Sequence, residues 1–130
     1  MLDTNICIFV IRQKPPVVVQ RFIQFAMDEL CISTVTLAEL RYGADKSGNA
    51  TKNHTALDSF LAPLAIVDFD PECAEHYGRV RSDLERIGQP IGLLDTMIAA
   101  HALRLRIPLV TNNTKEFARV SGLTLEDWST

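Results

Sequence analysis

The sequence lacks the features of membrane-spanning, disulfide-rich and secreted proteins. In its 130 residues no apolar run approaches the ~20 residues that a membrane-spanning helix requires. It has only three cysteines, Cys7, Cys31 and Cys73, scattered among apolar neighbours, which argues against a disulfide scaffold and favours buried thiols in a reducing compartment. No basic or apolar leader precedes the acid at position 3, so we see no signal peptide and expect a cytoplasmic protein.

Motifs of several common enzyme classes are missing as well. The chain has no G-x-x-x-x-G-K-[ST] phosphate loop, no G-x-S-x-G elbow and no G-x-G-x-x-G turn. His54, His76 and His101 lie in separate segments, without a serine or cysteine nucleophile and without the ligand spacing of a zinc site. The net charge of −3 argues against binding nucleic acid by overall electrostatics, but it leaves room for a basic rim around an acidic pocket.

The sequence does contain an alternation of short apolar strands and amphipathic helices. We expect strands at about 1–2, 30–33, 64–67 and 107–110, an edge strand at 123–125, and helices at about 6–11, 16–26, 36–43, 51–61, 71–87 and 95–103. Trp128 is expected to fold back as an apolar plug. The alternation predicts a single α/β domain over residues 1–130, with a mainly parallel central sheet and helices on both faces.

Polar side chains follow these strands near their carboxyl ends. They are Asp3-Thr4-Asn5, Glu39, and Asn113 with Glu116, and Asp95 is a group of the same kind that follows Ile91-Gly92-Leu93-Leu94. Because the carboxyl ends of parallel strands form a ligand-binding crevice, we expect Asp3, Glu39 and Asp95 to converge on one metal site. Carboxylates interspersed with Asn and Thr favour a hard cation, Mg²⁺ or Mn²⁺, over zinc. Such a site suits attack of a metal-activated water on a phosphodiester.

Glu39 and Asp95 also have purely structural explanations. Thr36-Leu37-Ala38-Glu39 fits a capping box, in which the Glu39 side chain reaches back to the backbone N–H of Thr36. Asp95 would open a helix, where the helix dipole favours an acid. Its neighbours Leu93, Leu94, Met97 and Ile98 indicate a partly buried seam, where a cation would remove the cost of an unpaired carboxylate.

The helix expected from residue 71 carries one apolar stripe. Its members are Cys73, Tyr77, Val80, Leu84 and Ile87. Arg79, Arg81 and Arg86 lie off the stripe and form either a solvated face or a contact with RNA or a partner.

Four stretches together resemble the successive motifs of a known family. They are Leu2-Asp3-Thr4-Asn5, Ser33 to Leu40 (STVTLAEL), Gly92 to Ala99 (GLLDTMIA) and Val110 to Phe117 (VTNNTKEF). In this order they resemble PIN-domain ribonucleases, most closely the VapC toxins of bacterial toxin–antitoxin pairs. The resemblance spans nearly the whole chain and implies the three-layer PIN fold.

The resemblance also implies an activity and partners. Members most similar to this chain are Mg²⁺- or Mn²⁺-dependent endoribonucleases that cut tRNA in the anticodon loop of the initiator, arrest translation and are neutralised by a VapB antitoxin. A homodimer is implied, and so is a basic antitoxin tail whose arginine enters the acidic site.

Site residues carry over by position. Asp3, Glu39 and Asp95 would be the metal-binding and catalytic acids. Asn113 takes the catalytic position where many relatives have a fourth acid, and Glu116 would assist from behind the metal ligands. Thr4 and Thr111 would orient carboxylates or the attacking water.

Two departures from the family pattern matter. Asn113 removes one negative charge, which weakens the binding of a second ion in the absence of RNA. The chain has only two residues before Asp3, where relatives usually have several more residues of first strand. We therefore expect the edge that holds Asp3 to be poorly fixed, and a start codon upstream of Met1 would account for the difference.

Two alternatives belong to other functional classes. One is a non-catalytic PIN module that binds RNA or antitoxin. The other is a phosphate-transfer domain, which is disfavoured because Asp3-Thr4-Asn5 lacks a second aspartate and no lysine ends a core strand.

Overall fold

The computed structural model describes residues 1–130 and contains two pairs of short parallel strands. Strand β1 (Cys31–Ser33) pairs with β2 (Ala65–Val67), and β3 (Leu109–Val110) pairs with β4 (Leu125–Glu126). The expected strands are confirmed, including the edge strand near residue 125.

Residues 1–3 join the two pairs into one sheet. The Leu2 N–H donates to the Cys31 carbonyl over 2.9 Å, and the Asp3 N–H donates to the Val110 carbonyl over 2.9 Å. The Val110 N–H in turn donates to the Met1 carbonyl over 2.8 Å, and the bridge between Leu2 and Val110 is parallel. The expectation of a poorly fixed edge at Asp3 is therefore wrong, because residues 1–3 lie in the middle of the sheet.

Both faces of the sheet are covered by helices, as predicted. Consecutive strand residues point to opposite faces, so Leu2 and Val110 belong to one buried cluster and Met1 and Leu109 to the other. The first cluster packs against α1 (Thr4–Arg12), α2 (Pro16–Ile23) and α4 (Ala50–Leu61). The second packs against α5 (Pro71–Arg86), α6 (Leu93–Leu105) and the short α7 (Thr114–Phe117).

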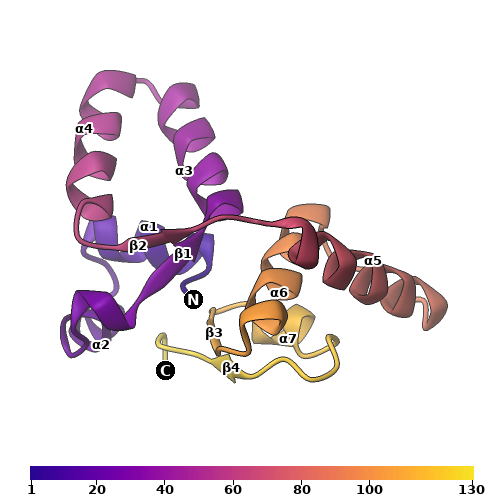
Figure 1. Ribbon diagram of the computed structural model, residues 1–130. Helices are drawn as coiled ribbons and strands as arrows, with labels where there is room; N and C mark the ends of the chain where they lie inside the picture. The colour runs from indigo at the N-terminus through magenta and orange to yellow at the C-terminus, as the bar shows by residue number, and fades with distance from the viewer.

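The remaining long helix, α3 (Thr34–Lys46), serves both clusters, with Leu40 in the first and Val35 in the second. It forms an antiparallel hairpin with α4 that projects from the sheet, while α5 extends in another direction along α6 (Figure 1). A 3₁₀ turn, η1 (Met27–Glu29), precedes β1. None of the helices has the length and apolar character needed to cross a membrane.

Helix starts explain how the sheet edge acquires its polar groups. Asp3 caps α1, its Oδ1 accepting the Thr4 N–H over 2.8 Å, and Asp70 caps α5 by accepting the Cys73 N–H over 2.9 Å. Ser33 caps α3, its Oγ accepting the Val35 N–H over 3.0 Å. Each cap satisfies a backbone donor that the helix itself leaves unpaired.

The predicted capping box at Thr36 to Glu39 is wrong. Helix α3 begins at Thr34, two residues earlier, because Ser33 at the end of β1 already serves as its cap. Glu39 consequently lies in the second turn of α3, where its side chain is available for a different partner.

The stripe predicted for α5 is correct at Cys73, Val80 and Leu84, which are buried, and wrong at Ile87, which is 60% exposed. Ile87 follows the last residue of α5 and so leaves the helical face. The arginines off the stripe fit a solvated face: Arg81 pairs with Glu85 at 2.9 Å and Arg86 with Asp83 at 2.8 Å, both within α5.

Trp128 belongs to the first cluster, and its truncation should destabilise the fold. Its ring is fully buried and stacks on Phe25 with centroids 5.3 Å apart. We expect Trp128→Ala to lower the free energy of unfolding by about 3–5 kcal/mol in guanidinium denaturation. Ile23, 69% exposed, provides the control, since Ile23→Ala should change it by less than about 0.5 kcal/mol. Equal losses in the two variants would contradict the role of Trp128.

Candidate active site

Asp3 is the most deeply buried of the acids expected at the carboxyl ends of the strands. Only 4% of the residue is exposed, and both oxygens accept hydrogen bonds. Oδ1 accepts the Thr4 N–H over 2.8 Å, and Oδ2 accepts the Thr111 hydroxyl over 2.8 Å. Thr111 directly follows β3, so the orientation of Asp3 is fixed by the neighbouring strand.

Glu39 reaches the same place from α3. The Thr4 hydroxyl donates to Glu39 Oε1 over 2.6 Å, and the Thr36 hydroxyl lies 3.4 Å from the Thr4 oxygen. Thr4 thus contacts Glu39 through its side chain and Asp3 through its backbone. Thr36 is fully buried, and the sequence patterns predicted only a helix-capping role for it. Its position three residues before Glu39, on the same face of a helix, was the available signal.

Asp95, in the first turn of α6, faces the other acids. Its pKa is raised to about 6, first by burial and then by the charges of Asp3, Glu39 and Glu116. Burial also raises the pKa of Asp3, as does the charge of Glu39, while the hydrogen bonds from Thr111 and Thr4 lower it. Because these charges act on one another, the three acids lie in one region of the structure, as expected, and their binding of one metal ion stays a prediction.

Asn113 donates hydrogen bonds to two side chains next to these acids, those of Glu116 and Thr111. Its side-chain N–H donates to Glu116 Oε2 over 2.9 Å, and its backbone N–H donates to the Thr111 hydroxyl over 3.0 Å. The carboxylate that faces Asp95 from this segment is therefore that of Glu116, on α7. In this arrangement Asn113 orients the carboxylate of Glu116, whose charge acts on Asp95.

The donor set is that of a hard cation. It consists of carboxylate oxygens with threonine hydroxyls around them. Burial and the charges of the other acids raise the pKa of Asp95, and a divalent ion would lower that pKa again. No group of three or more His, Cys, Asp or Glu side chains is arranged to hold an ion directly. In proteins Mg²⁺ commonly keeps several water ligands, through which carboxylates can also hold it.

Comparison with known proteins identifies the fold family. The family model described as PIN domain matches residues 1–123. The chain belongs to the PIN-domain family. Over 129 residues it is 48% identical to the tRNA(fMet)-specific endonuclease VapC of Shigella flexneri, covering 99% of this chain and 97% of that protein. It is 44% identical to a Salmonella typhimurium protein of the same description over 98% of this chain and 96% of the relative.

Solved structures agree with the PIN assignment and with its VapC branch. The DNA-bound VapBC complex from Salmonella typhimurium contains a chain that superposes with a TM-score of 0.92 at 44% identity, covering 98% of this chain and 96% of that one. VapBC2 from Rickettsia felis, bound to a DNA fragment from its promoter, gives a TM-score of 0.91 at 42% identity over 98% and 97% of the two chains. The predicted α/β fold with a mainly parallel sheet is confirmed.

His101 takes no part in the acidic site of this PIN domain. It is fully buried, its Nδ1 lies 2.8 Å from the Ser33 hydroxyl, and its ring meets the edge of Phe69. Burial lowers the pKa of His101, which favours the neutral ring. Its role is to connect α6 to the cap of α3, and thus to fix the two helices that carry Asp95 and Glu39.

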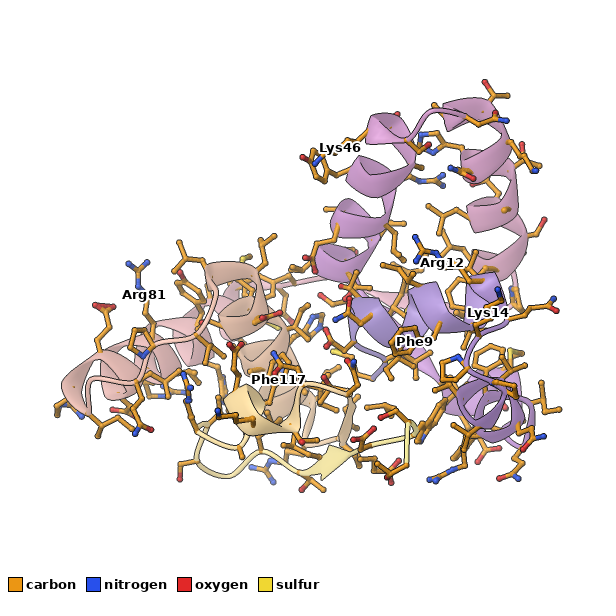
Figure 2. All side chains as sticks on the ribbon, turned by 180° about the vertical axis from the view of Figure 1, so that it is seen from behind. Phe9, Arg12, Lys14, Lys46, Arg81 and Phe117 are labelled. Carbon is orange, nitrogen blue, oxygen red and sulfur yellow. The ribbon has the colours of Figure 1, made fainter.

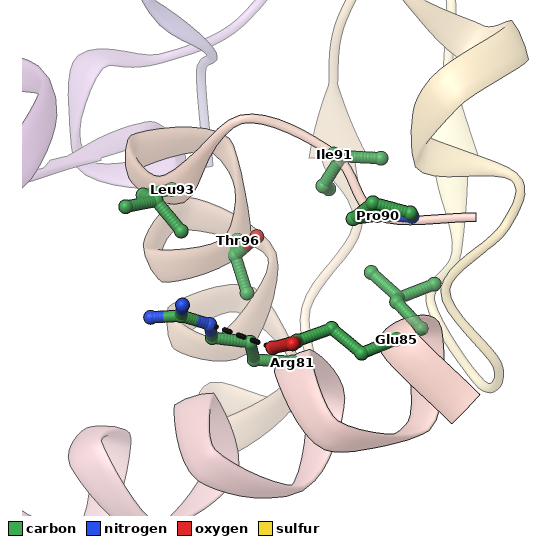
Figure 3. Close-up of a pocket in the computed structure, with 7 residues that line it drawn as sticks. Arg81, Glu85, Pro90, Ile91, Leu93 and Thr96 are labelled. Atoms are coloured by element: carbon green, nitrogen blue, oxygen red, sulfur yellow. Dashed lines mark hydrogen bonds and ion pairs between the residues drawn. The ribbon is translucent and has the colours of Figure 1, made fainter. Parts of the chain in front are cut away.

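Two hollows in the surface of the domain differ in their relation to the acidic site. A groove of about 240 Å³ runs between α1, α3 and α4; Glu39 and Arg12 are its charged members, and apolar side chains including Ile8, Leu40 and Leu57 line it. A smaller hollow of about 170 Å³ lies between α5 and α6, where the Arg81–Glu85 ion pair forms one wall and Leu93 and Thr96 another (Figure 3). No carboxylate of the acidic site lines the smaller hollow.

In metal-free protein the ionised Asp95 side chain should lower the stability of the fold, because burial and the neighbouring charges disfavour its charged form. A carboxyl whose pKa is higher in the folded state favours folding when protonated, so this contribution is lost as pH rises from about 4 to the folded value of about 6. In EDTA we expect Asp95→Asn to raise Tm relative to wild type at pH 7.5, by a few degrees, and much less at pH 4.5. Thermal unfolding followed by circular dichroism measures the Tm of both proteins at each pH. A variant that is less stable than wild type at pH 7.5 would contradict this account.

Proposed function

We propose that this chain is a VapC-type toxin: an endoribonuclease that hydrolyses tRNA phosphodiester bonds with the help of Mg²⁺ or Mn²⁺. The observation that carries the proposal is the grouping of Asp3, Glu39 and Glu116 around Asp95, whose pKa is raised to about 6 by burial and by these three charges. The descriptions of the Shigella and Salmonella relatives as tRNA(fMet)-specific endonucleases support tRNA as the substrate, with initiator tRNA as the first candidate. We place the activity in the cytoplasm, where tRNA is found.

The chain's own residues would divide the work as follows. Asp3, Glu39 and Asp95 would hold the cation, which when bound activates a water and neutralises charge on the scissile phosphate. Thr111 fixes Asp3 over 2.8 Å, and Thr4 fixes Glu39 over 2.6 Å, so neither carboxylate needs to reorient when RNA arrives.

Asn113 acts indirectly in this proposal. Its amide fixes the Glu116 carboxylate, which adds negative charge beside Asp95 and strengthens the attraction for a cation. The catalytic position suggested for Asn113 by the resemblance thus becomes a positioning role, with Glu116 nearer to the chemistry.

A VapB-type antitoxin is the proposed partner, supported by the VapBC complexes among the structural relatives. The groove between α1, α3 and α4 has a mainly apolar lining that includes Glu39, so it suits an apolar segment that carries a basic side chain toward the acidic site. We also propose that the toxin is a homodimer, on the basis of the family resemblance.

Cleavage of bulk tRNA by antitoxin-free protein tests the proposed activity. With Mg²⁺ we expect discrete fragments, whose mapped ends give the cleavage position, and no fragments with EDTA. Asp3→Asn and Asp95→Asn should each lower the cleavage rate by about a hundredfold or more, the order expected when a group acting directly on the reacting centre is lost. Thr111→Val should lower it less, since it removes only the hydrogen bond that orients Asp3.

The matched control is Asp28→Asn, which removes an exposed acid of η1 outside the site and should leave the rate unchanged. Intact tRNA in every reaction, from wild-type protein shown by circular dichroism to be folded, would overturn the nuclease proposal. If that protein still bound tRNA in EDTA, the non-catalytic RNA-binding module would take its place.

A further inference from the structure

The outer part of α3 presents an aromatic side chain that no part of the fold covers. Tyr42 is 64% exposed, and the Lys46 ammonium lies 5.8 Å from the centre of its ring. Resting on the proposed ribonuclease activity, we propose that Tyr42 and Lys46 form a stacking platform for one unpaired base of the RNA substrate, next to the acidic site.

Helical periodicity places the platform on the side of α3 that faces α6. Val35 lies seven residues, or about two turns, before Tyr42 and therefore on nearly the same face. Val35 is buried in the second cluster with Ile98 and Ala99 of α6. The face of α3 that bears Tyr42 is consequently the one directed toward the helix that carries Asp95.

Tyr42 is also close to Glu39 along α3. Residues three apart on a helix are neighbours on its surface, with a rise of about 4.5 Å between them. A base stacked on Tyr42 would lie one turn outward from the Glu39 carboxylate, which the Thr4 hydroxyl holds at the acidic site. The backbone of the same strand could then reach the acids.

Lys46 supplies the charge that an RNA ligand requires there. It lies one further turn along α3, and Figure 2 shows it on the side of that helix turned toward α5 and α6. An ammonium beside an aromatic ring can make two kinds of contact with a nucleotide, since the ring stacks on the base while the cation pairs with the phosphate. An apolar protein partner would instead favour an uncharged surround.

RNA binding in EDTA tests the platform without relying on cleavage. The probe is a single-stranded RNA octamer with one 2-aminopurine, whose fluorescence falls when the base stacks. Tyr42→Ala should raise the Kd roughly five- to a hundredfold and reduce the fluorescence change, because stacking of one base is lost. Tyr42→Phe, which keeps the ring, should bind like wild type.

Lys46→Ala should weaken binding mainly at low salt and lower the dependence of log Kd on log salt by about one unit. Lys52→Ala, which removes an exposed lysine of α4, is the matched control and should leave stacking unchanged. In Mg²⁺, Tyr42→Ala should raise KM for bulk tRNA by more than it lowers kcat.

The outcomes separate this inference from the nuclease proposal. Wild-type protein that cleaves tRNA, with Tyr42→Ala binding and cleaving equally well, overturns the platform and leaves the nuclease intact. Binding that depends on Tyr42 without any cleavage supports the platform and overturns the nuclease. Wild-type protein that binds no RNA overturns the platform. So does a Tyr42→Ala variant with normal RNA binding but a changed mass by light scattering, because the face then joins two copies of the chain.

Discussion

The pairing of residues 1–3 between β1 and β3 is the constraint on which the rest of the structure depends. Without it, the sheet would fall into two separate pairs of strands, each too small to be stable on its own. The three backbone hydrogen bonds at Met1, Leu2 and Asp3 also determine where the acidic site can form. Asp3 leaves the sheet at its centre, so groups from α3, α6 and the β3 end can all approach it.

Stability and chemistry are opposed at this site. Four carboxylates that face one another cost folding energy, and burial adds to the cost at Asp3 and Asp95. Neutral hydroxyl donors at Thr4 and Thr111 offset part of it for Glu39 and Asp3, and they do so without cancelling the charge that attracts a cation. A lysine or arginine in place of either threonine would stabilise the acids more and leave little affinity for a metal ion.

Sequence patterns predicted that Asp3 and Glu39 lie near one another because both follow strands of a parallel sheet, whose carboxyl ends meet at the same edge. Asp95 follows no strand in the structure and reaches the other acids from the first turn of α6. The patterns did not predict which polar groups bond to one another. Ser33 and Thr36 are equally good caps by type, and only the end of β1 decides in favour of Ser33 and frees Glu39 for Thr4. The exposure of Ile87 likewise depends on where α5 ends, which periodicity alone does not define. The links from Asn113 to Glu116 and from His101 to Ser33 also depend on side-chain geometry.

The hydrogen bond between Thr111 and Asp3 spans 108 positions of the chain. During synthesis Asp3 is made long before Thr111, so the nascent protein cannot complete its acidic site until both residues have emerged from the ribosome. Contacts over such distances along the chain also slow folding after release. A protein built in this way spends most of its synthesis without its clustered acids in place.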